Sequence, residues 1–171
     1  MPILKTIKSR RSIREFKDKP VEQSKIIKIL EAGRWAPSGL NNQPWKFVVV
    51  RDKEVRSKLA ECTESDDVVL GAPVNIAVFL DKGREYNRIK DIQAIGACIQ
   101  NMLLEVHDLK LGACWLGEIL NQRTKVEKLL GVSKKLELMA VIAVGYPKAK
   151  KRRGSRRSLR SQIIKNYSIK N

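Results

Sequence analysis

The sequence predicts a mixed helix and sheet domain, an α/β or α+β sandwich. Segments with helical periodicity alternate with short β-branched runs along the chain. The length of 171 residues is that of one ordinary domain, and a hydrophobic content of 43% can supply its core. We therefore expect residues 1–171 to form a single domain.

Two helices and a polar loop open the chain. Residues 3–9 are predicted to form a short helix, and residues 22–35 a longer amphipathic one. Pro37 begins the loop that ends the second helix, because proline cannot continue it. Residues 45–50 follow as a β-branched run of the kind found in strands that are buried on both faces.

The rest of the chain continues the alternation. We expect, in order, a helix over 53–62, a polar connection over 63–71, a strand over 73–80, a helix over 88–110, a strand over 111–116, a helix over 122–130 and a strand over 138–144. Gly131 is placed to close the helix before it. Residues 161–171 carry too much apolar surface for a solvated tail, and we expect this segment to dock.

The longest predicted helix, residues 88–110, is apolar on almost every face. A helix of this kind must be covered nearly all round. In a domain of this size one side can face the sheet, and a second copy of the chain is the simplest cover for the other. A central position in a monomer is the alternative.

The formal net charge of +17 suggests a polyanionic partner. Much of the excess lies in the basic run 148–160, Lys-Ala-Lys-Lys-Arg-Arg-Gly-Ser-Arg-Arg-Ser-Leu-Arg. No aromatic residue interleaves this run, whereas proteins that bind single strands normally place stacking rings beside their cations. The run therefore favours, at most, a sequence-tolerant contact with nucleic acid or another polyanion.

The three cysteines, Cys62, Cys98 and Cys114, have no metal-binding spacing, so neither a disulfide framework nor a zinc site is favoured. No apolar run reaches the roughly 20 residues that cross a bilayer, and the first residues contain no signal peptide. We expect a cytoplasmic protein with reduced, buried cysteines and no contact with a membrane.

Two short motifs carry the chemistry. Arg10, Arg11, Ser12 and Arg14 place three guanidinium groups and a hydroxyl within five residues, a pattern that suits a phosphate ester. One helix later, Pro37-Ser38-Gly39-Leu40-Asn41-Asn42-Gln43-Pro44-Trp45 forms a stiff polar turn that can present backbone and amide hydrogen bonds.

Together these motifs resemble those of the nitroreductase family of flavin enzymes. Further matches around residues 112–117 and 145–159 extend the resemblance over nearly the whole chain. The resemblance implies a three-layer sandwich whose central, mostly antiparallel sheet is flanked by helices. It also implies a homodimer with FMN at the subunit interface and a domain-swapped C-terminal segment on the partner subunit.

The resemblance also assigns residues to the cofactor. Arg10 and Ser12 lie where the family holds the FMN phosphate and its neighbourhood, with Arg11 between them, and Arg14 where a cation faces the N1 and O2 edge of the ring. Pro37, Ser38, Gly39 and Asn41 match a loop that reaches the flavin of the other protomer. The remaining matches are Trp115, Leu116 and Gly117, whose backbone lies beside the flavin in the family. Arg156 and Arg157 also match, and one of them is expected to contact the phosphate.

The sequence argues against several other chemistries. A single histidine, His107, at the polar end of a helix favours a surface or capping role and excludes a Ser-His-Asp triad. Neither a P-loop nor a Rossmann fingerprint is present. Cys114 has no neighbouring base to activate it, so a thiolate mechanism is not favoured.

The resemblance thus predicts an FMN-dependent oxidoreductase that passes hydride from NADH or NADPH to a nitroaromatic, a quinone or a flavin by a ping-pong mechanism. No protein side chain is needed as a catalytic acid or base. Two alternatives remain open. One is a non-catalytic flavin-binding or polyanion-binding protein that uses the basic run, and the other is a relative with dehalogenase or flavin-destructase chemistry.

Overall fold

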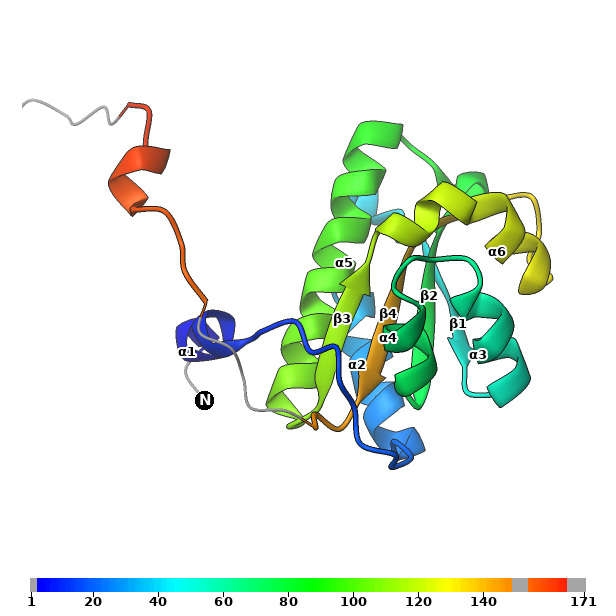
Figure 1. The fold of residues 1–171 in the computed structure, drawn as a ribbon. Coiled ribbons are helices and arrows are strands. Elements are labelled where there is room, and N and C mark those ends of the chain that lie inside the picture. Colours follow the sequence, from blue (N-terminus) through cyan, green and yellow to red (C-terminus); the bar gives the residue numbers. More distant parts are fainter. Residues whose placement is uncertain (1–2, 149–153, 166–171) are drawn as a thin grey trace, which may run out of the picture.

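The computed structural model describes residues 3–148 and 154–165, and it is a three-layer sandwich (Figure 1). The middle layer is a four-stranded sheet in the order β1-β2-β4-β3, in which all neighbouring strands are antiparallel. The strands are β1 (Trp45–Val50), β2 (Val74–Asp81), β3 (Gly112–Leu116) and β4 (Leu136–Gly145). This architecture confirms the expected fold class.

Helices cover both faces of the sheet. The helices of the described residues are α1 (Ile3–Ser9), which lies against α5 and not on the sheet, α2 (Gln23–Arg34), α3 (Lys53–Ala60), α4 (Asp66–Gly71), α5 (Arg88–Asp108) and α6 (Arg123–Leu129). One core joins α2 and α5 to the sheet, and a second core joins α3, α4 and α6 to the opposite face. Strand β2 serves both cores, because Ile76 and Val78 face the first while Ala77 and Phe79 face the second.

Two sequence expectations are wrong in this region. Strand β1 is the edge strand rather than one buried on both faces, and its Lys46 is exposed. The β-branched composition of a run does not distinguish an edge strand from a central one. Residues 63–71 are not only a polar connection, since they contain α4, whose Val68 and Val69 enter the second core.

His107 is also placed differently from the expectation of a surface or capping role. Its side chain is buried, and its Nε2 lies 2.7 Å from the Ser9 hydroxyl. The contact ties the end of α1 to the end of α5. The polar sequence around His107 does not reveal that α1 covers it.

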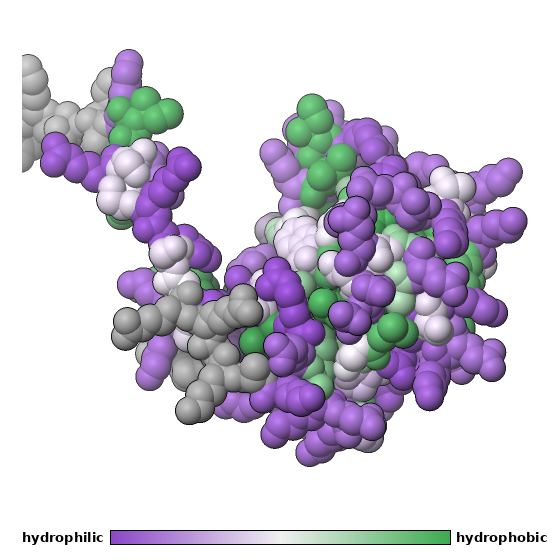
Figure 2. Space-filling view, in the orientation of Figure 1, coloured by the Kyte–Doolittle hydropathy of each residue, from purple (hydrophilic) through white to green (hydrophobic). Residues whose placement is uncertain are grey.

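One side of α5 is left uncovered by the described residues. Ile89 is 71% exposed and Ile92 38%, and nothing lies within 4 Å of the space that a side chain at Gly96 would fill. Figure 2 shows apolar surface near the upper end of this helix. A second copy of the chain as its cover stays a prediction.

The C-terminal segment 154–165 contains one helical turn, Leu159–Gln162, and stands away from the sandwich (Figure 1). Leu159, Ile163 and Ile164 are exposed. Residues 161–165, the described part of the segment expected to dock, therefore do not pack on the sandwich, and docking on a partner subunit stays a prediction. Residues 149–153 of the basic run and the apolar residues Tyr167 and Ile169 lie outside the described residues.

In the described parts of the chain, no helix combines the length and apolar character needed to cross a membrane.

Candidate functional site

The arginine motif lies against the free edge of β3. The Ile13 N–H donates to the Ala113 carbonyl at 2.9 Å, and Ser12 pairs with Ala113 in a parallel bridge. Ile13 is buried beneath this edge, so its neighbours Ser12 and Arg14 point outward and are exposed. The close approach requires Gly112, because a Cβ there would come within 2.8 Å of the Ile13 side chain.

Arginine side chains gather at this edge. Partial burial, followed by repulsion from Arg11 and Arg156, lowers the pKa of Arg10. Within residues 3–148 and 154–165, the salt bridges include none of Arg10, Arg14, Arg156 or Arg157. Repulsion among like charges is relieved by an anion, so the edge is suited to bind one.

Arg11 is used differently from its two neighbours. Its Nη1 donates to the carbonyls of Lys8 and Arg10, both at 2.7 Å. A Cβ at Gly154 would lie 2.6 Å from the Arg11 Nε, so the C-terminal segment crosses directly beside this guanidinium. Arg11 therefore stabilises the turn after α1, and the C-terminal segment passes the arginine motif at Gly154.

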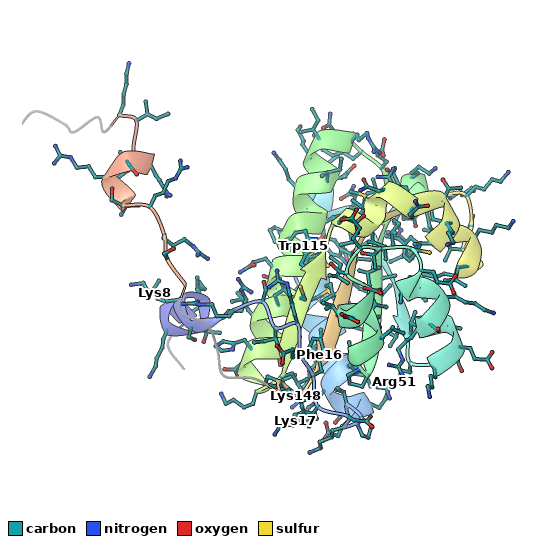
Figure 3. The ribbon with its side chains drawn as sticks, viewed as in Figure 1. Lys8, Phe16, Lys17, Arg51, Trp115 and Lys148 are labelled. Carbon is teal, nitrogen blue, oxygen red and sulfur yellow. The ribbon has the colours of Figure 1, made fainter. Side chains whose placement is uncertain are left out.

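Strand β3 forms the wall beside these cations. Cys114 is buried, and desolvation raises the pKa of its thiol despite the opposing influence of Arg14 and Arg10. The thiol is therefore held neutral, which agrees with the expectation that Cys114 is not a nucleophile. Trp115 is 41% exposed (Figure 3), Leu116 is buried, and a side chain at Gly117 would meet nothing within 4 Å.

The Pro37 loop is a rigid turn that uses most of its own polar groups. The Ser38 hydroxyl accepts from the Gln43 N–H at 3.0 Å, and the Ser38 carbonyl accepts from the Asn41 N–H at 3.1 Å. Leu40, Asn41 and Gln43 have φ values of 53°, 53° and 48°. Three non-glycine residues in the left-handed region store strain, which persists only where the surroundings hold the loop in place.

Asp91 holds the loop in place, and sequence reasoning missed it. Its buried Oδ1 accepts from Asn42 Nδ2 at 2.7 Å, while its Oδ2 accepts from the backbone N–H groups of Tyr86 and Asn87. Burial opposes ionisation of Asp91, but the hydrogen bonds from Asn42, Asn87 and Tyr86 outweigh it and lower its pKa. In the sequence, Asp91 looks like an ordinary acid in the first turn of a helix.

The remaining loop residues are divided between buried and exposed positions. Pro44 and Trp45 are buried, and the Pro44 carbonyl accepts from the Asp81 N–H at 2.7 Å. Gly39 lies against the Tyr86 ring, and a Cβ at this position would come within 2.7 Å of it. Pro37 and Asn41 are exposed and can contact another molecule.

The two motifs lie at opposite ends of α5. The loop is fixed to Asp91 near the start of the helix, whereas the segment before Arg10 is fixed to His107 near its end. Sixteen residues of helix separate these anchors, or about 24 Å at 1.5 Å per residue. The structure thus brings Arg10, Ser12 and Arg14 to β3 and the C-terminal segment, but it does not bring the loop to them within one chain.

Comparisons with known proteins identify related sequences and structures. The model of the Nitroreductase family matches residues 7–65 and 60–146. A protein of Methanothermobacter thermautotrophicus named "Putative NADH dehydrogenase/NAD(P)H nitroreductase" is 37% identical over 149 residues, which cover 86% of this chain and 78% of that protein.

Two further proteins are similar to this chain. The Bacillus subtilis protein named FMN reductase (NAD(P)H) is 31% identical over 130 residues, covering 76% of this chain and 51% of its own. The crystal structure of a Desulfovibrio desulfuricans protein in complex with FMN has 46% sequence identity and a TM-score of 0.93, with 98% of each chain covered.

Proposed function

The chain belongs to the nitroreductase family, and we propose that it is an FMN-dependent oxidoreductase that takes electrons from NADH or NADPH. The observation that carries the proposal is the pair of guanidinium groups of Arg10 and Arg14, which form no salt bridge within the described residues and are held beside β3 by the Ile13 to Ala113 hydrogen bond. The relatives support the cofactor, since one is an FMN reductase and another is a structure with FMN.

The residues at the edge of β3 fit the phosphate of FMN. The half-buried Arg10 and the exposed Ser12 hydroxyl, two positions apart in the chain, offer charge-assisted and neutral hydrogen bonds. Arg156 stands close enough to lower the pKa of Arg10, so it or Arg157 can complete the phosphate site. A dianionic phosphate would relieve the repulsion among these groups.

The chain also offers what the ring end of a flavin needs. Bound FMN supplies the hydride chemistry, and the protein supplies orientation and electrostatics. The exposed Arg14 keeps a permanent positive charge beside β3, which favours negative charge on the pyrimidine side of a ring. Beyond it, the open space at Gly117 allows a planar group to approach the backbone of residues 115–117 closely.

The proposed enzyme is a homodimer with two sites shared between subunits. Within one chain the Pro37 loop is held about 24 Å along α5 from the anchor of the arginine motif, so a second copy must bring Pro37, Gly39 and Asn41 to the cofactor. The uncovered side of α5, with Ile89 and Ile92 exposed, provides apolar surface for that copy. The C-terminal segment would then dock on the partner.

The proposed reaction is ping-pong hydride transfer to a nitroaromatic, a quinone or a flavin. The reduced nicotinamide leaves before the acceptor occupies the same face of the cofactor. Residues 82–87, between β2 and α5, are too few to cover the site with an inserted domain, so it stays open to varied acceptors. The three cysteines are buried, so none offers an exposed thiolate to compete with the flavin.

The visible spectrum of the purified protein, supplemented with FMN and freed of excess, tests this proposal. We expect flavin absorbance bands that bleach on anaerobic addition of NADH or NADPH and return when a quinone or nitroaromatic is added. The same FMN concentration without protein is the control for direct reduction. A protein that retains no flavin, or whose bound flavin neither nucleotide reduces, would contradict the proposal.

A further inference from the structure

A second cationic site lies at the end of the sheet where β1 ends and β2 begins, and its lining starts two residues after Arg14 of the arginine motif. It is a cavity of about 580 Å³ between the segment after Phe16, the end of β1, the start of α3 and the end of α4. Figure 3 shows Phe16, Lys17 and Arg51 at this end of the sheet. The volume is that of a site for a small organic ligand.

The cavity does not share a side chain with the proposed flavin site. Its lining comes mainly from the end of β1, the start of β2, α3 and α4, whereas Ser12 of the arginine motif pairs with β3, and the segment after Phe16 is the link between the two. The site therefore needs an explanation other than flavin binding.

The charged residues around the cavity are mostly cations. Lys17, Arg51, Lys53 and Arg56 line it, and Asp18 is the one acid among its lining residues. No salt bridge within the described residues includes any of these five side chains. The wall thus carries a formal charge of about +3, and none of its cations forms a salt bridge within the described residues, which is the condition that favours an anionic ligand.

Arg56 gives the cavity a fixed charge. Its Nη1 donates to the Leu70 and Ala72 carbonyls at 3.0 and 2.9 Å, so the guanidinium is held across the end of α4. Its Nε is buried and has no hydrogen-bond partner among the described residues. Two carbonyls hold the group in position but do not neutralise it, so the charge is already in place before a ligand arrives.

The inner surface of the cavity is apolar. Phe16, Val21 and Val74 line it with only small exposed fractions, and Leu70 adds a half-exposed aliphatic side chain. Inorganic phosphate would leave this surface unused. A ligand with an anionic group for the rim and an apolar or aromatic body for the floor would use both parts.

We propose that this cavity binds a phosphorylated organic molecule of the size of a nucleoside diphosphate, with its phosphates at Lys17 and Arg51 and its aromatic body against Phe16 and Val21. Nucleic acid is a less suitable ligand, because a single concave site does not follow an extended backbone. The proposal goes beyond the flavin chemistry and does not depend on it.

Calorimetric titration of the FMN-loaded protein with ADP tests the proposal, at about 0.15 M salt so that nonspecific attraction is screened. Adenosine and pyrophosphate, titrated separately, report on the two halves of the ligand. The test variant is Lys17→Gln with Arg51→Gln, which leaves the structural Arg56 intact. The control variant is Lys46→Gln with Lys58→Gln, which removes the same charge from exposed residues of β1 and α3 outside the cavity.

We expect ADP to bind with one equivalent per chain, and to bind more tightly than pyrophosphate or adenosine. The test variant should weaken ADP binding at least about tenfold, because it removes two charge-assisted contacts, while the control changes it less than about twofold. The visible spectrum of each sample reports flavin content separately, so loss of flavin is distinguished from loss of ADP.

Three results would overturn the proposal. The first is an absence of ADP binding at millimolar concentration. The second is an equal loss of ADP binding in both variants, which would indicate general electrostatic attraction or binding at the flavin. The third is binding of a single-stranded oligonucleotide, but not of ADP, that depends on Lys17 and Arg51.

Discussion

The arginine motif and the Pro37 loop are built on opposite principles. In the segment Arg10–Arg14 the backbone is tied to β3, while Ser12 and Arg14 are free to meet a ligand. In the loop the polar groups mostly bond one another, and three residues are held in left-handed conformations. The arginine motif thus provides charge for a ligand, whereas the Pro37 loop provides a fixed backbone conformation.

This difference predicts how each region fails when it is changed. A cation acts through its charge, so its loss should reduce ligand affinity and leave the fold intact. A strained loop acts through its geometry, so loss of its anchor should reduce stability as well as binding. The two regions can therefore be told apart by measuring both quantities on the same variants.

The largest expected effect is the loss of FMN in the variant Arg10→Gln with Arg14→Gln. Charge-assisted hydrogen bonds contribute about 1.5–3 kcal/mol each, so FMN should bind at least about a hundredfold more weakly. Fluorescence titration of the apoprotein with FMN measures this affinity. The urea unfolding free energy of the apoprotein should change by less than about 1 kcal/mol, since neither side chain is in a salt bridge with another described residue.

The control for this variant is Lys46→Gln with Lys58→Gln, which lowers the net charge equally at exposed positions away from β3. Equal weakening of FMN binding in both variants would show that the overall charge attracts the cofactor. A large fall in stability of the arginine variant alone would show that the motif is structural, and the contrast between the two regions would then fail.

Most of the fold was predictable from the sequence because apolar periodicity reports burial. The long helix is the clearest case, since the predicted range 88–110 corresponds to α5 over Arg88–Asp108. The errors occur where burial depends on a distant part of the chain. Val68 and Val69 form too short an apolar run to reveal α4, and His107 is buried because α1 lies over it.

The candidate site was predictable where a local motif carries it. Arg10, Ser12 and Arg14 could be named together with residues 115–117, and the structure places both groups at β3. Asp91 could not be named, because its role comes from a contact with Asn42, 49 positions away. The separation of the motifs along α5 is likewise a property of the fold.

The next largest effect is expected for Asp91→Ala, which removes the anchor of the loop. The variant leaves three N–H donors without the carboxylate that accepts from them, so the free energy of unfolding in urea should fall by about 2–4 kcal/mol. FMN affinity should fall as well, although this side chain is buried. Asp108→Ala, at the exposed end of the same helix, is the control and should change neither quantity.

The same variant should alter the dependence of stability on pH. Because the pKa of Asp91 is lowered from the usual 3.8, its ionised form stabilises the folded chain fully above about pH 4, and this contribution is lost as pH falls through the lowered pKa. Unfolding free energies between pH 3 and 6 should therefore fall less steeply towards acid in Asp91→Ala than in the unchanged protein. Parallel curves would show that Asp91 is not the ionised anchor.

The smallest effect is the most direct test of how the two regions meet. If the loop of one chain completes the site of another, a mixture of the arginine variant and Asp91→Ala can form dimers in which one site has both halves unaltered. Random exchange makes half of the dimers mixed, and one of the two sites in each mixed dimer is intact. FMN binding should therefore return to about one quarter of the sites of the unchanged protein.

The mixture is first mildly denatured and refolded so that the chains exchange. FMN binding is then measured at an FMN concentration between the dissociation constant of the unchanged protein and those of the variants. Each variant refolded alone is the control and should bind little FMN under the same conditions. If both regions instead serve a site within one chain, every chain in the mixture carries a defect and binding will equal the mean of the two controls.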